Sequence, residues 1–332
     1  MHRVVIFTHE ASGIPAILIR STVAALASRP DIALAAICVP ERPAFATRCC
    51  RPLLRRARAR LQALYAPVGK RRHHEPSPIP LNRWARRFRF KVLVPPAGNI
   101  NHPQFIERLR HELEPTIALS FFCLQKFSPE LLAVFNHAVN YHNGFLPQYR
   151  GLKATAWSIY HGDRESGFAF HRMDARFDRG PILLQEAIPV TPDRSESDHE
   201  MDKAVAAAAH IPRVLRMAMN GDPGIPQQGN RRYFSWNDYL AATRIADPSV
   251  LSSTELEQRL RAFGCLRIQI AGCWQPVTSV RPLPDAHGKS GRFCFRASDG
   301  VLLEPVRFEH LPYAVYRTLR WCARRLPGRI RP

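Results

Sequence analysis

Short apolar runs alternate with helical patterns along the first half of the chain. The run at 3–7 suits a buried strand, a turn follows at 9–13, and the apolar pattern at 14–26 is typical of a helix. Further strand candidates lie at 32–39, 91–94, 116–122, 138–141 and 167–173, and helix candidates at 103–113, 128–135 and 154–160. Strand, turn and helix in this order predict an α/β domain at 1–195, with an open, mostly parallel, doubly wound sheet.

The chain changes character after residue 190. Residues 196–219 carry a helical pattern, and residues 220–230 are rich in Gly, Pro and Asn, which is the composition of a linker. Later candidates are helices at 235–245 and 252–263 and strands at 266–271, 277–281, 291–297 and 301–308, with a hairpin signal at Asp299-Gly300. We therefore expect a helix and linker at 196–230 and a smaller β-rich domain at 231–332.

Three polar side chains form the candidate site. Asn140 and His142 stand two residues apart at the end of a strand candidate, so both project on the same side. Asp178 supplies a carboxylate further along the chain. In acyl transfer an amine attacks a carbonyl carbon, and hydrogen-bond donors must wait where negative charge collects on the oxygen. An amide, an imidazole and a carboxylate suit this chemistry.

The motifs around these residues occur in a recognisable order. Asn-x-His and the following Leu-Pro and Gly lie between Asn140 and Gly151, Gly-Asp-x-x-x-Gly spans 162–167, and Asp-x-Gly begins at Asp178. This order resembles the folate-dependent formyltransferase family, which includes methionyl-tRNA and glycinamide ribonucleotide formyltransferases. The resemblance covers residues 1–190 well and the remainder loosely. Gly144 and Phe145 replace the usual Ser and Leu, which leaves the three polar residues intact and puts only the turn in doubt.

The resemblance implies a role for each polar residue. Asn140 and His142 would polarise the formyl group of 10-formyltetrahydrofolate, the co-substrate of the family. Asp178 would orient His142 and help move the proton that the attacking amine releases. A carboxylate beside an imidazole favours the protonated form and fixes the tautomer, so this assignment is physically coherent.

The resemblance also implies where the folate ring binds. Two segments match the family's folate-contacting loops, and the residues expected to contact the co-substrate are Phe122, Leu124, Gln125, Lys126, Phe127, Met173, Asp174 and Phe177. A flat heterocycle with polar edges needs apolar walls and a few fixed backbone hydrogen bonds. Residues 8–13 lack a Gly-rich phosphate loop, which argues against a nucleotide cofactor there. The eight cysteines show no metal-ligand spacing, so we expect no metal and reduced cytosolic thiols.

Positive charge is concentrated at 41–91, within a net charge of +21. This segment is interpreted as a basic insertion, with a helix expected at 51–65. Such a stripe could neutralise phosphates of an initiator tRNA, and it could equally be a solvated face. The chain has no run of about 18 apolar residues, so we expect no membrane partner and a cytoplasmic location.

The sequence predicts a 10-formyltetrahydrofolate-dependent N-formyltransferase acting on a primary amine, with methionyl-tRNA as the leading acceptor. One alternative keeps the chemistry and takes a small amine, such as a nucleotide-linked amino sugar or an amino acid derivative. Another alternative, from a different class, is a non-catalytic module that binds nucleic acid or protein. The oligomeric state stays open.

Overall fold

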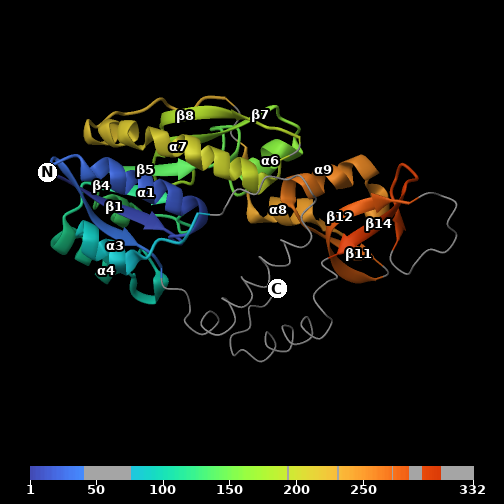
Figure 1. The fold of residues 1–332 in the computed structure, drawn as a ribbon, viewed down its shortest axis with the longest axis horizontal. Helices are drawn as coiled ribbons and strands as arrows, with labels where there is room; N and C mark the ends of the chain where they lie inside the picture. Colours follow the sequence, from blue (N-terminus) through green and yellow to red (C-terminus); the bar gives the residue numbers. More distant parts are fainter. Residues whose placement is uncertain (41–75, 193, 230–231, 271, 284–293, 308–332) are drawn as a thin grey trace. The chain divides into compact units, whose positions relative to one another are not determined.

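We describe the protein from a computed structural model. The described residues are 1–40, 76–192, 194–229, 232–270, 272–283 and 294–307 (Figure 1). Residues 1–158 with 162–234 form one compact unit, and residues 159–161 with those from 235 onward form another. The expected helix at 51–65 and most of the basic insertion lie outside the described residues.

The first unit is built on a seven-stranded sheet with the order β3-β2-β1-β4-β5-β7-β8 (Figure 1). Its strands are β1 (His2–Thr8), β2 (Ile32–Cys38), β3 (Lys91–Leu93), β4 (Ile117–Phe121), β5 (His137–His142), β7 (Glu165–Arg172) and β8 (Ile182–Pro189). The strands from β3 to β5 in this order are parallel, and β7 and β8 pair antiparallel at the edge. The expected open, mostly parallel sheet is confirmed.

Helices cover both faces of this sheet (Figure 1). They are α1 (Gly13–Ala27), α3 (Leu81–Phe88), α4 (Pro103–Arg108), α5 (Pro129–Leu132) and α7 (Glu196–Met219), and a further helix, α6 (Ala154–Tyr160), lies between β5 and β7 in the chain. The expected helix at 103–113 is α4 followed by a π-helical turn at Leu109–Leu113, and the helix expected at 128–135 is limited to α5. Ser195 begins α7 with a capping box to Asp198, which satisfies exposed backbone groups at the helix start.

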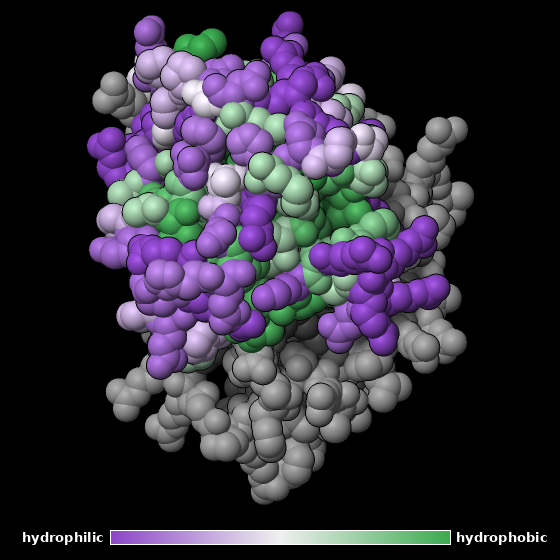
Figure 2. All heavy atoms as spheres, turned by 90° about the vertical axis from the view of Figure 1, so that its left-hand side faces the viewer, coloured by the Kyte–Doolittle hydropathy of each residue, from purple (hydrophilic) through white to green (hydrophobic). Residues whose placement is uncertain are grey.

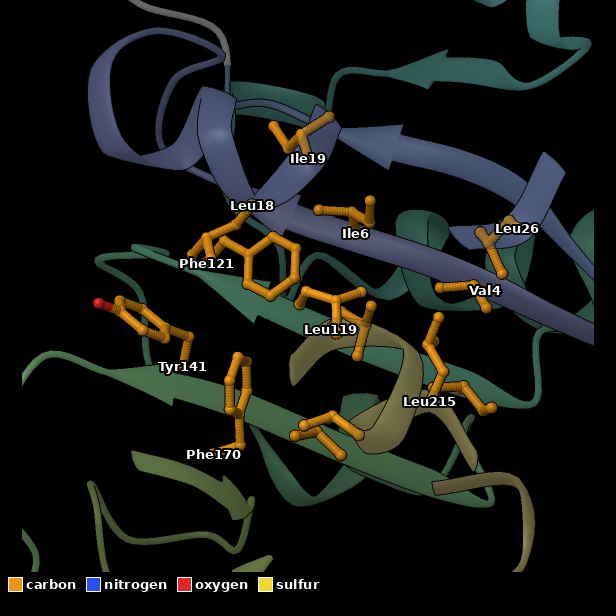
Figure 3. Close-up of a cluster of buried hydrophobic side chains, with 14 of the residues drawn as sticks. Val4, Ile6, Leu18, Ile19, Leu26, Leu119, Phe121, Tyr141, Phe170 and Leu215 are labelled. Atoms are coloured by element: carbon orange, nitrogen blue, oxygen red, sulfur yellow. The ribbon is translucent and has the colours of Figure 1, made fainter. Parts of the chain in front are cut away.

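Alternate residues of β1 enter two separate cores, because successive side chains of a strand face opposite sides. Val4 and Ile6 pack with residues of α1 and α7, including Leu18 and Leu215 (Figure 3). Val5 and Phe7 pack on the other face, among residues of α4 and α5. Strands buried on both faces appear in the sequence as continuous apolar runs, which explains why these strands were predictable.

The second unit carries a five-stranded sheet with the order β10-β11-β12-β14-β13. Its elements are α8 (Trp236–Thr243), β10 (Arg244–Ile245), a 3-10 turn (Pro248–Val250), α9 (Ser253–Phe263), β11 (Leu266–Ile270), β12 (Cys273–Pro282), β13 (Phe295–Arg296) and β14 (Leu302–Arg307). The hairpin expected at Asp299-Gly300 joins β13 to β14, and Gly300 has a φ of 82° there. The β-rich character expected for this part of the chain is confirmed.

One short ribbon was not expected from the sequence. It pairs β6 (Arg150–Gly151) in parallel with β9 (Tyr233–Phe234), and both strands belong to the first unit. The Phe234 ring stacks on Trp157 at 4.5 Å between centroids, which fixes the ribbon against α6.

The surface drawn in Figure 2 is largely hydrophilic, with apolar residues showing between the charged ones. Among the described residues, no helix is both long enough and apolar enough to cross a membrane.

Candidate active site

The candidate site lies where β5 ends beside β4 and β7. In the register of the sheet, Asn140 stands between Ser120 of β4 and His171 of β7. Ligands of open α/β sheets bind beyond the carboxyl ends of the parallel strands. His142, the last residue of β5, is at such an end.

The three polar residues expected from the sequence come together in the structure. Nδ1 of His142 lies 3.6 Å from Oδ1 of Asp178, which is an ion-pair distance and longer than a hydrogen bond. Asn140 joins this pair through His171, because its Nδ2 atom lies 3.1 Å from Nε2 of His171. The same Nε2 atom lies 3.5 Å from Oδ1 of Asp178. Asn140, His142, His171 and Asp178 therefore form one polar cluster, in which Asn140 is half-buried and the other three side chains are buried.

His171 was not among the residues expected to be functional. Its strand was predicted, and a residue facing Asn140 across an antiparallel pair can be found only once the register is known. Nδ1 of His171 lies 2.7 Å from the carbonyl oxygen of Arg172. A carbonyl only accepts, so Nδ1 carries the proton and Nε2 accepts from Asn140. One amide hydrogen of Asn140 is thereby engaged, and its second amide hydrogen has no acceptor among the residues that the structure describes.

The tautomer of His142 follows from a backbone contact. Nε2 lies 2.6 Å from the carbonyl oxygen of Tyr149, which requires a proton on Nε2. Burial lowers the pKa of His142, and the neighbouring charge of Asp178 opposes that shift without cancelling it. His142 is therefore a neutral imidazole near pH 7, with a lone pair on Nδ1 facing Asp178.

Asp178 is 9% exposed, and it stays ionised. Burial alone would raise the pKa of Asp178, but His142, His171 and the backbone amide of Gly151 together hold it below its ordinary value. Oδ2 accepts a hydrogen bond from the Gly151 amide at 2.9 Å. The ribbon that contains Gly151 therefore has a direct link to the carboxylate.

The backbone around Asp178 is held in an uncommon conformation. Asp178 has a φ of 52°, in the left-handed region that side chains rarely adopt. A Cβ atom at Gly180 would overlap the Arg172 carbonyl oxygen, so that position of the Asp-x-Gly motif requires glycine. Nε2 of Gln227 donates to the carbonyl oxygens of Asp178 and Gly180, at 3.0 and 2.7 Å. Gln227 lies in the segment that was expected to be only a linker, and it fixes this turn.

The departure at Gly144 has a steric reason. A Cβ atom there would overlap the Cβ atom of Ala154 in α6 and would lie 3.0 Å from Nε2 of His142. Glycine thus permits the close approach of the turn to α6 while the His142 ring keeps its place.

The expected folate-contacting residues after β4 differ in what they touch. The Gln125 side chain accepts from the Ile100 amide at 3.1 Å and donates to the Gly98 carbonyl at 2.6 Å. It therefore ties the loop after β4 to the loop after β3. The Phe127 ring is buried against Phe7 at 4.8 Å, so only its backbone is left for a ligand.

The other expected contacts offer more accessible groups. Phe122 has a φ of 57°, and its ring lies 5.6 Å from the Tyr141 ring. Leu124 and Phe177 are 64% and 44% exposed, which is high for apolar side chains of this size. The remaining three are more polar or partly covered: Lys126 is exposed, and Met173 and Asp174 are half-buried.

No group of three or more His, Cys, Asp or Glu side chains suited to a metal ion occurs in the described parts of the chain.

Residues 96–215 match the formyl transferase family. The chain carries a formyl transferase domain. The matched segment contains Asn140, His142, His171 and Asp178, and the family predicted from the motifs is confirmed.

Two curated relatives are GDP-perosamine N-formyltransferases from Brucella melitensis and Brucella abortus. Each is 39% identical over 126 residues, which is 38% of this chain and 48% of the relative. The chain thus spans about half the length of the curated relatives it matches.

Solved structures share the fold at lower identity. An N-formyltransferase from Helicobacter canadensis, crystallised with folinic acid and dTDP-3-aminofucose, matches with a TM-score of 0.57 and 16% identity, over 93% of this chain and 100% of that one. A sugar N-formyltransferase from Shewanella sp. matches with a TM-score of 0.57 and 15% identity, over 93% and 97%. These likenesses agree with the formyl transferase domain at the level of the fold.

Proposed function

We propose that the protein is an enzyme that transfers a formyl group from 10-formyltetrahydrofolate to the primary amine of a nucleotide-linked amino sugar. The observation that carries this proposal is the polar cluster at the end of β5, in which His142 faces Asp178 directly and Asn140 is linked to Asp178 through His171. An amide donor and a neutral imidazole beside an ionised carboxylate are the groups that acyl transfer to an amine needs.

The co-substrate would supply an electrophilic formyl carbon. The second amide hydrogen of Asn140 donates to the oxygen on which negative charge collects. Nδ1 of His142 takes the proton that the attacking amine releases, because Nε2 already carries one. The resulting imidazolium stands 3.6 Å from the Asp178 carboxylate, which stabilises it. The bond between the formyl carbon and N10 of the co-substrate would then break, and that nitrogen would take the proton back from His142, so that tetrahydrofolate leaves and the neutral imidazole is restored.

The described loops suit a folate. Leu124 and Phe177 offer exposed apolar side chains from the loops after β4 and β7. Gln125 holds the loop after β4, so its backbone groups keep a fixed direction. Apolar walls with a few fixed hydrogen bonds are what a flat, polar-edged ring requires. The folinic acid in the Helicobacter canadensis structure supports the same choice.

A small amine replaces methionyl-tRNA as the leading acceptor. The curated relatives are GDP-perosamine N-formyltransferases, and the Helicobacter canadensis structure contains dTDP-3-aminofucose. The basic segment that motivated the tRNA hypothesis lies mostly outside the described residues. The structure therefore offers no contact or surface in that part of the segment that would support binding of tRNA. A non-catalytic module is disfavoured, since it would have no use for an ionised carboxylate buried beside two histidines.

The test is transfer of labelled formyl groups from 10-formyltetrahydrofolate into a panel of acceptors. The panel contains GDP-perosamine, dTDP-3-aminofucose, charged initiator tRNA, free amino acids and no acceptor. We expect label in at least one nucleotide-linked amino sugar and none in tRNA. Label in tRNA alone, or release of formate with every acceptor, would overturn the assignment.

A further inference from the structure

A lysine is buried beneath the candidate site. Lys203 of α7 has no exposed surface, and its Nζ atom has three oxygen neighbours. It donates to Oγ of Ser166 at 2.6 Å, to Oγ1 of Thr155 at 3.0 Å and to the carbonyl oxygen of Asn143 at 3.4 Å. An ammonium group has three hydrogens, so these contacts use all of them. They belong to β7, α6 and the turn after β5, which Lys203 therefore joins.

This placement costs free energy. A buried ammonium loses its hydration, and an apolar side chain of similar size would fill the same volume without that loss. Burial lowers the pKa of Lys203 to about 7, although Glu200 and Glu196 oppose the shift. Burial likewise raises the pKa of Glu200 to about 7. Packing alone therefore does not explain a lysine at this position.

The contact with Asn143 leads directly to the site. Asn143 follows His142, and its carbonyl oxygen also accepts from Oγ1 of Thr155 at 3.2 Å. Its side-chain oxygen accepts from the Tyr141 hydroxyl at 3.1 Å, and that hydroxyl points away from the apolar cluster in Figure 3. The turn after β5 is thus held at Asn143, by Tyr141 through the side chain and by Thr155 and Lys203 through the backbone carbonyl.

We propose that Lys203 is a positioning residue for formyl transfer: its ammonium group holds the Asn143 carbonyl, and through it keeps His142 oriented toward Asp178. The inference rests on the proposed function. Lys203 touches none of the reacting groups, and it acts through the turn.

The charge of Lys203 has a second effect on His142. The titratable groups that interact electrostatically with Lys203 are Glu196, His199 and Glu200 of α7 and His142 of β5. Below pH 7 Lys203 is mostly protonated and Glu200 is mostly neutral, so the positive charge is not cancelled there. That charge lowers the pKa of His142 further, after the larger effects of burial and of the neighbouring His171.

Lys203 acts on the turn through its hydrogen bonds and on His142 through its charge, and the variants Lys203→Met and Lys203→Arg separate these two effects. In Lys203→Met, His142 loses a positive neighbour, so its pKa rises and the acid limb of kcat/KM moves to higher pH. We expect kcat to fall about tenfold or more, with KM for the folate donor within about twofold, since a displaced catalytic group slows chemistry more than donor binding. Lys203→Arg keeps the charge and disturbs the hydrogen bonds, so kcat falls while the acid limb stays in place.

A folded Lys203→Met variant with wild-type kcat and an unmoved acid limb would overturn the inference. If Lys203→Met does not fold, Thr155→Val replaces it, because Oγ1 of Thr155 contacts both Asn143 and Lys203. Thr155→Ser, which keeps the hydroxyl, is its matched control. We expect Thr155→Val to lower kcat and Thr155→Ser to preserve it, and equal kcat in both variants would reject the positioning role.

The two proposals fail in different ways. If wild-type protein transfers no formyl group to any acceptor, the proposed function fails. An NMR titration of labelled histidine still tests the electrostatic link, comparing wild type with a folded variant that lacks the Lys203 charge. A higher His142 pKa in that variant supports the inference, and an unchanged value contradicts it.

Discussion

The Nε2 atom of His142 lies 2.6 Å from the backbone carbonyl oxygen of Tyr149. This contact assigns the proton of the neutral ring to Nε2 and directs the basic lone pair of Nδ1 toward Asp178. The carboxylate therefore acts after the proton has arrived, by stabilising the imidazolium. The backbone, and not Asp178, selects the tautomer.

Asp178→Asn should change the pH profile in a defined direction. The negative charge of Asp178 raises the pKa of His142 against the stronger effect of burial. Without the charge, the pKa of His142 falls further, and the acid limb of kcat/KM moves to lower pH. The maximal rate should fall by about 100-fold, since the imidazolium loses its partner. Rates measured from about pH 5 to pH 8 test this, and an unmoved acid limb would contradict it.

Asp178 also contributes to stability in a pH-dependent way. Its folded-state pKa lies below the ordinary value, so its contribution is present above about pH 4 and is lost as the pH falls below that. Urea unfolding of wild type at a series of acidic pH values should therefore lose more stability than unfolding of Asp178→Asn. Parallel losses in the two proteins would mean that Asp178 does not titrate abnormally.

Gly144→Ala should destabilise the protein by about 1–3 kcal/mol, the usual cost of overpacking. The added methyl group would overlap the Cβ atom of Ala154. Ala154→Gly removes that atom, so Gly144→Ala/Ala154→Gly should regain part of the stability beyond the sum of the single effects. Denaturant midpoints of the three variants measure this. Simple additivity would show that the two positions do not meet.

Gln227→Leu should release the turn at 178–180. The variant has about the same volume and loses the hydrogen bonds to the carbonyl oxygens of Asp178 and Gly180. Since Asp178 then holds its place less well, kcat should fall about tenfold, with a smaller change in KM for the folate donor. Replacement of the exposed Gln228, a neighbour with no assigned role, serves as the control. Equal kcat in the two variants would show that Gln227 does not position Asp178 for catalysis.

The sequence predicted the parts of the fold that have strong local signals. The buried strands of the first sheet were evident because both of their faces are apolar, and α7 was evident from a long helical period. The ribbon of β6 and β9 was not evident. Each of its strands has two residues, which is too short for any periodicity.

The candidate site was predicted only where motif order carried information. Asn140, His142 and Asp178 belong to the ordered motifs, and they meet as expected. Gln227 and Lys203 could not be found in this way. Gln227 lies in a segment with the composition of a linker, and a lysine in an amphipathic helix is normally assigned to the solvent face.

The most direct test of the assigned site is the single-turnover rate of formyl transfer in Asn140→Ala, at saturating donor and acceptor. We expect a fall of about 100-fold or more with folding and donor binding retained, because the variant loses the amide that donates to the developing negative charge. His210→Ala, a change on α7 that removes a 2.6 Å side-chain contact with Glu186 outside the described cluster, is the matched control and should keep the wild-type rate. A folded Asn140→Ala protein that transfers formyl groups at nearly the wild-type rate would contradict the assignment of the site.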